Sequence, residues 1–131
     1  MKHRRHLAMA VCLTACFVGA ARAETIQPVF QQALPAVAGK TLTAVTVDFA
    51  PGERAAPHRH GQAFVFAYVL SGRVRSQLEG QPARVYRAGD SWPEPPGSHH
   101  VLTENVSATE PARLLVIFVA DTGAALKTDD R

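Results

Sequence analysis

The sequence predicts an all-β protein with one domain, arranged as a barrel or a sandwich. Short apolar segments recur along the chain, and turn signals rich in glycine and proline separate them at intervals of about eight to twelve residues. No segment shows the apolar spacing of a convincing amphipathic helix. The 131 residues less a predicted leader of 23 leave 108, a length that can bury one adequate hydrophobic core.

The segment 40–49 is the first with a clear strand pattern, because Val45 and Val47 fall on one apolar face. The segment 64–70 (FVFAYVL) is apolar on both faces. This predicts a wall strand with side chains packed inside and another sheet covering the outside. Further strands are predicted at 58–60, 73–78, 83–87, 91–94, 99–103 and 113–119.

The N-terminus has the pattern of a secretory signal peptide. A basic start precedes an apolar run at 7–21, and the Ala-Arg-Ala site at 21–23 precedes Glu24. The run is too short for a transmembrane span, so we expect cleavage after residue 23 and a periplasmic protein without a transmembrane segment in its mature form. The alternative is a lipobox at 13–16, which would anchor the chain to a membrane through Cys16.

Charge and cysteine usage exclude several classes of partner and ligand. Four of the 14 basic residues and none of the 11 acidic residues lie in 1–23, so the mature chain has a net charge of about −1. The sequence therefore predicts no nucleic-acid partner. Cys12 and Cys16 both lie in the leader, which leaves the mature domain without a disulfide or a thiolate metal ligand.

Two segments flank the predicted strands. Residues 24–39 contain Pro28 and Pro35 and are expected to form an extended arm with at most one turn of helix. Residues 121–131 are small, polar and aperiodic, which predicts a flexible tail. The barrel domain is accordingly assigned to 40–120.

Four histidines of the mature chain lie in two short segments. His58 and His60 are two residues apart, so on a strand both imidazoles point to the same face. Such a pair can bind one metal ion if a neighbouring strand supplies a third ligand, and His100 is the natural candidate. His99 would face the other way on the same strand, as an outer residue or a surface residue.

The spacing around these histidines resembles the paired motifs of the cupin superfamily. Five residues separate Gly52 from His58, and eleven separate His60 from Gly72; the second motif runs from Gly89 through the turn at 95–97 to His100. The resemblance implies a single cupin-type jelly-roll β-barrel that binds one divalent ion (Fe, Mn, Zn or Ni) and a small-molecule ligand. It also implies a possible homodimer, to which the arm at 24–39 would contribute an exchanged strand.

The chain departs from the cupin pattern at two positions. Cupins usually carry a glutamate ligand where this chain has Val65, and the asparagine expected after the last histidine comes one residue late, at Asn105. Three neutral imidazoles would leave the full charge of a divalent ion uncompensated, which favours an anionic or enolate-like ligand. Glu94 is the nearest carboxylate of the second motif, and it either serves the site as a catalytic base or ligand, or is simply solvated.

The cupin resemblance alone does not choose a function, because the fold hosts many activities. We expect an iron-dependent or manganese-dependent oxygenase that acts on a small acidic or diketone-like molecule, since three imidazoles on one side of an ion leave room for substrate and dioxygen. The alternative is a non-catalytic module that binds a metal or a small ligand.

Overall fold

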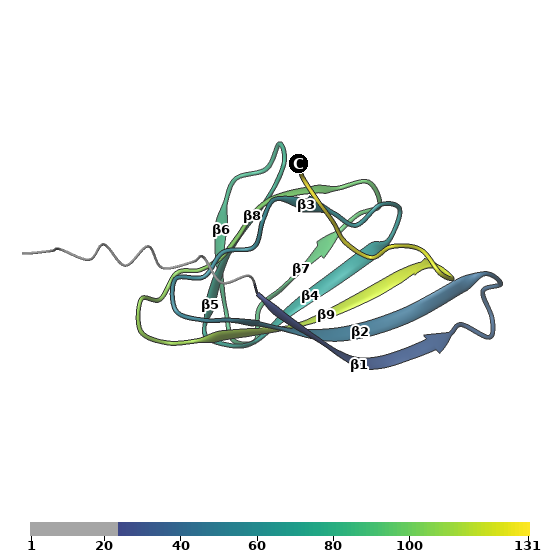
Figure 1. The fold of residues 1–131 in the computed structure, drawn as a ribbon, viewed down its shortest axis with the longest axis horizontal. Coiled ribbons are helices and arrows are strands. Elements are labelled where there is room, and N and C mark those ends of the chain that lie inside the picture. Colours follow the sequence, from purple (N-terminus) through teal and green to yellow (C-terminus); the bar gives the residue numbers. More distant parts are fainter. Residues whose placement is uncertain (1–23) are drawn as a thin grey trace, which may run out of the picture.

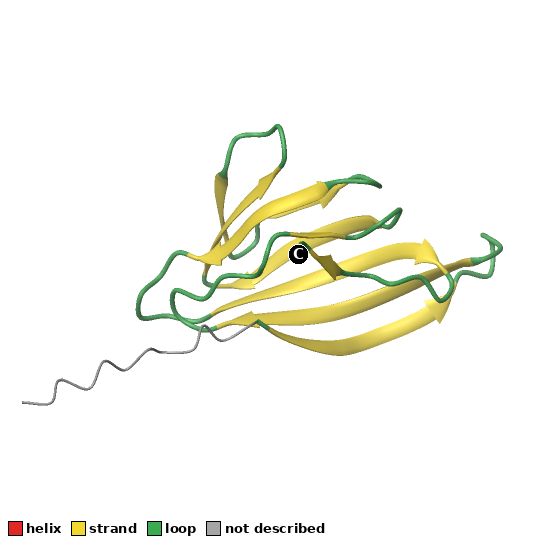
Figure 2. Cartoon of the chain, turned by 45° about the horizontal axis from the view of Figure 1, so that its top comes forward, coloured by secondary structure: helices red, strands yellow, loops and turns green. Residues whose placement is uncertain are grey.

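The computed structural model describes residues 24–131, so the predicted signal peptide and Cys16 lie outside the described residues. The described chain consists of strands, turns and loops without a helix (Figure 2). The first sheet has the order β1 (Thr25–Ala33), β2 (Lys40–Phe49), β9 (Ala112–Asp121), β4 (Phe64–Ser71) and β7 (Ser91–Glu94). The second has the order β10 (Thr128–Asp129), β3 (His58–Arg59), β8 (His99–Asn105), β5 (Arg73–Leu78) and β6 (Arg84–Arg87).

The two sheets form the antiparallel jelly-roll that the sequence predicts. Both sheets have five strands, but those of the first sheet are longer, and it is called the larger sheet below. In Figure 1 the larger sheet lies below the smaller one. Each predicted strand is present, within one or two residues of its expected bounds. In the described residues, no helix is long and apolar enough to cross a membrane.

The hydrophobic core lies between the sheets and is built by alternation. Buried and less buried residues alternate along β9 and along 65–69 of β4 and 45–49 of β2. The outer face of β4, which we expected another sheet to cover, is instead partly open: Phe64 and Leu70 are each 44% exposed. The apolar residues that line the inner face are Val45, Val47, Phe49, Val65, Ala67, Val69, Leu114, Val116 and Phe118.

Both flanking segments pair with the barrel. The arm at 24–39 is extended, as predicted, and its strand β1 pairs with β2 of the same chain at the edge of the larger sheet. Pro28 and a bulge at the next residue are typical of such an edge. The segment 121–131, predicted to be a flexible tail, differs from expectation: Asp121 ends β9, and β10 pairs with β3. The sequence did not predict β10 because a strand of two residues is too short to show an alternating side-chain pattern.

Candidate metal centre

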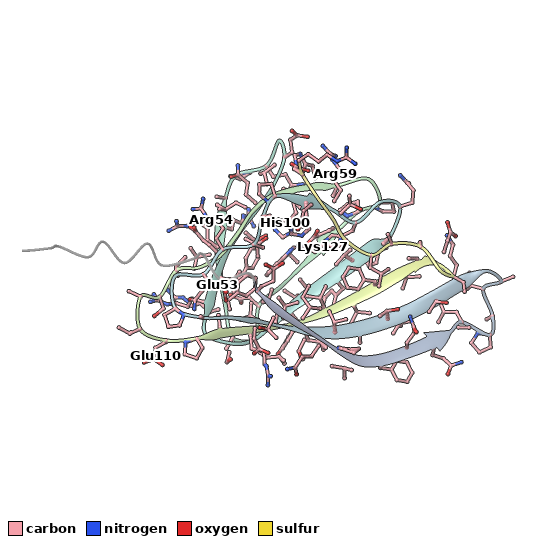
Figure 3. All side chains as sticks on the ribbon, viewed as in Figure 1. Glu53, Arg54, Arg59, His100, Glu110 and Lys127 are labelled. Carbon is pink, nitrogen blue, oxygen red and sulfur yellow. The ribbon has the colours of Figure 1, made fainter. Side chains whose placement is uncertain are left out.

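Three buried histidines converge between the two sheets. His58 lies directly opposite His100 because β3 and β8 pair in this register, and His60 follows two residues later. The ring centroid of His58 lies 4.8 Å from that of His60 and 5.0 Å from that of His100. All three side chains are buried, and one nitrogen of each lies within 4.8 Å of the others. Figure 3 shows His100 between the two sheets.

Backbone carbonyls fix the orientation of two of the rings. His58 Nδ1 lies 2.7 Å from the carbonyl oxygen of Ala56, and His60 Nδ1 lies 2.5 Å from that of Leu126. A carbonyl only accepts, so each Nδ1 carries the proton and each Nε2 keeps a free lone pair. Metal-binding histidines are commonly held in this way, and these two rings therefore fit a divalent ion.

His100 has polar partners on both sides of its ring. Its Nε2 lies 2.8 Å from the hydroxyl groups of Ser76 and Thr103, and its Nδ1 lies 3.2 Å from Oε1 of Glu94. A neutral ring that donates from Nδ1 to the carboxylate accepts the hydroxyl protons at Nε2. An ion bound through His100 would therefore replace one of these partners.

Glu94 is part of this cluster. Its side chain is 3% exposed, so the alternative that it is solvated is wrong. Oε1 accepts a hydrogen bond of 3.0 Å from Trp92 Nε1, whereas Oε2 is buried without a hydrogen-bond partner, 3.5 Å from His60 Nε2. An unpaired buried carboxylate oxygen indicates that the site is built to receive a further polar or charged group.

The titration behaviour of the cluster follows from its burial. Burial lowers the pKa of His58 from 6.5 to about 4, although the hydrogen bond to the Ala56 carbonyl opposes this change. Burial lowers the pKa of His60 as well. For Glu94, burial raises the pKa, but the hydrogen bond with His100 and the charge that His100 can carry outweigh it and leave the pKa below its usual value. At neutral pH the site thus holds the neutral imidazoles of His58 and His60 beside an ionised carboxylate.

Val65 stands directly opposite Glu94 on the neighbouring strand and is fully buried. Residues opposite each other in an antiparallel pair point to the same side of the sheet. The carboxylate that cupins usually carry at the Val65 position is therefore present one strand away. A divalent ion held by the three histidines would therefore meet one negative charge, that of Glu94, instead of none.

The cavity beside the histidines has a volume of about 180 Å³ and is mostly apolar. At its mouth, Lys127 Nζ lies 2.9 Å from Oε1 of Glu24 and 2.5 Å from Oδ1 of Asp129. Sequence reasoning missed Glu24, Leu126 and Lys127, because nothing in the pattern of either terminal segment marks a contact with the cavity. Its apolar wall includes Ile26, Val45, Val47, Phe49, Ala67, Leu114, Val116, Phe118 and Leu126.

The remaining motif residues lie outside the cavity, as expected. His99 turns away from His100, and its Nε2 lies 2.6 Å from Oδ2 of Asp130. Asn105 is buried at the end of β8, where its Nδ2 donates to the carbonyl oxygens of Ala50 and Glu110 in the neighbouring loops. Its late position in the motif therefore concerns the loop rather than the metal centre.

The comparisons with known proteins agree with this geometry. The Cupin domain family matches residues 45–118, more than half of the chain, and the chain belongs to this family. Among curated proteins, none matches the sequence.

Several solved structures are similar. An oxalate oxidase shares 32% identity over 59% of this chain and 41% of its own, with a TM-score of 0.54. The DMSP lyase DddQ from Ruegeria pomeroyi DSS-3 shares 24% identity over 79% of this chain and 50% of its own, with a TM-score of 0.64. An uncharacterised protein with a double-stranded β-helix domain from Klebsiella pneumoniae shares 20% identity over 86% and 88%, with a TM-score of 0.65. The last two likenesses show the fold alone. This chain spans about half of the length of the oxalate oxidases it matches.

The position of Val65 opposite Glu94 predicts how substitutions at the two residues change the free energy of unfolding. Val65→Glu should destabilise the protein by roughly 3 kcal/mol, because it buries a second carboxylate beside Glu94. The double variant Val65→Glu/Glu94→Gln, which keeps a single carboxylate, should recover much of this loss. Urea unfolding of the wild type, the two single variants Val65→Glu and Glu94→Gln, and the double variant measures the coupling. An equal loss of stability in the Val65→Glu variant and the double variant would show that the two side chains do not interact.

The lowered pKa of His58 predicts an acid-sensitive fold in the metal-free protein. Between about pH 6.5 and pH 4 the unfolded chain binds a proton at this histidine and the folded chain does not, so stability falls as the pH falls. The shift corresponds to about 3 kcal/mol. His58→Gln should flatten this part of the stability profile, as measured by urea unfolding at each pH. An unchanged acid slope in His58→Gln would contradict the assignment.

Proposed function

We propose that this protein binds one divalent first-row metal ion through His58, His60 and His100 and oxygenates a small, mostly apolar, diketone-like molecule. The single observation that carries the proposal is the position of three buried, mutually close imidazoles at the end of an apolar cavity. Imidazole ligands suit Fe, Zn and Ni, and a carboxylate such as Glu94 suits Mn; iron or manganese would supply the redox chemistry and Lewis acidity that dioxygen requires.

The size and lining of the cavity support this substrate class. An apolar cavity of about 150 Å³ holds benzene, so a volume of about 180 Å³ accommodates roughly six to eight non-hydrogen atoms. Apart from histidine, Lys127 is the one basic residue that lines the cavity in residues 24–131, and the carboxylates of Glu24 and Asp129 neutralise it. With Glu94 also ionised, a dicarboxylate would meet net repulsion outside the metal itself.

This charge pattern favours a different substrate from the one that the similar oxalate oxidases bind. Oxalate oxidases of up to 32% identity act on a small dicarboxylate, as their name states. Here the apolar wall instead suits the alkyl ends of a diketone, whose two oxygens can chelate a metal. Glu94 Oε2, which has no hydrogen-bond partner, is placed to accept a proton from the acidic carbon between the two carbonyl groups.

The metal ligands are tested by substitution. We expect His58→Ala, His60→Ala and His100→Ala each to lose most bound metal after dialysis, measured by elemental analysis of protein loaded with Fe, Mn, Zn or Ni. Arg59→Ala is the matched control, because Arg59 lies between two of the ligands and is exposed. Full metal content in His100→Ala would refute the three-histidine site.

The activity is tested with an oxygen electrode on protein loaded with Fe(II) or Mn(II). Pentane-2,4-dione should drive oxygen consumption and oxalate should not, and Glu94→Gln should lower the rate roughly 10²-fold to 10⁴-fold. Binding of the diketone without oxygen uptake would favour the non-catalytic alternative, in which the cavity serves only to bind a small ligand. Faster turnover of oxalate than of the diketone would overturn the substrate class.

A further inference from the structure

The C-terminal segment 126–130 contacts the metal centre through its backbone. The carbonyl oxygen of Leu126 accepts the hydrogen bond from His60 Nδ1. Two residues later, β10 pairs with β3, so that Thr128 lies opposite Arg59 and Asp129 opposite His58. The chain thus runs alongside both histidines of the first motif, and Figure 1 shows the C-terminus beside β3.

A strand of two residues needs an anchor to stay in place. Two contacts of Asp130 provide it: its backbone N donates to the carbonyl oxygen of Pro57 at 2.9 Å, and its Oδ2 lies 2.6 Å from His99 Nε2. The side chain of His99 is 14% exposed and that of Asp130 is 39% exposed, so the contact is shielded from water on the His99 side only. β8 therefore presents His100 to the cavity and, on its opposite face, His99 to the C-terminal segment.

We propose that the His99–Asp130 pair is a clamp that positions the metal ligand His60. The clamp holds the C-terminal segment on β3, which keeps the Leu126 carbonyl on His60 Nδ1 and leaves Nε2 of that ring unprotonated for the ion. His99 and Asp130 are positioning residues and touch neither metal nor substrate. A hydrogen-bond partner such as the Leu126 carbonyl fixes the tautomer and orientation of a ligating histidine. The inference rests on the proposed metal site.

The test compares two clamp variants with one control. Asp130→Ala removes the side-chain contact with His99 and keeps the backbone hydrogen bond to Pro57, and His99→Ala removes the other partner of the same contact. Glu79→Ala is the control, because it removes the other carboxylate near His99, an exposed one whose Oε1 lies 3.4 Å from Nδ1, and leaves the contact between His99 Nε2 and Asp130 intact. Zn(II) affinity is measured by competition with a chromophoric chelator, and the His60 tautomer is measured by ¹⁵N NMR of the metal-free protein.

We expect each clamp variant to bind Zn(II) roughly 10-fold to 100-fold more weakly than the wild type. The double variant should be no weaker than either single one, because both break the same contact. His60 should change from the pure Nδ1–H form to a mixture of tautomers, and the Glu79→Ala control should match the wild type in both measurements. Wild-type affinity in both clamp variants, or an unchanged His60 tautomer, would overturn the clamp. A wild-type protein that binds no metal would refute the proposed function instead, while the tautomer measurement would still decide the clamp.

Discussion

The site depends on the register between β3 and β8, which places His58 opposite His100. Side chains alternate along a strand, so a slip of one residue would turn one of these imidazoles out of the cavity. The register also decides where His99 points and which backbone edge of β3 is free to pair with β10. A single strand pair thus sets the positions of the ligands and of the segment that supports them.

Burial gives the cluster its electrostatic character. Two imidazoles are held neutral by desolvation, and one carboxylate remains ionised because His100 hydrogen bonds to it. The same low-polarity environment strengthens any charge interaction inside the cavity. The chain therefore keeps a negative charge beside the histidines even though Val65 occupies the position at which cupins usually place one.

The strands and the shared face of His58 and His60 were predictable because both depend on side-chain patterns with a period of two, and His100 was predictable as the third ligand from its place in the second motif. The proximity of Glu94 to the histidines was predictable as one alternative, from its place in the second motif. Its alignment with Val65 was not, since that depends on how two strands separated along the chain pair with each other. The role of Leu126 was hidden for another reason: it contributes a backbone carbonyl, which every residue possesses.

The family match ends at residue 118 and begins at residue 45, yet the cavity is also lined by Glu24, Ile26, Leu126 and Lys127. The segment that the family matches thus supplies the histidines and most of the apolar wall, and the two terminal segments supply the remaining four lining residues. Changes at the termini can alter what enters without disturbing the packed interior, since exposed segments tolerate substitution better than a core. Related chains with the same histidines and different ends would be expected to differ in ligand preference while keeping the same metal chemistry.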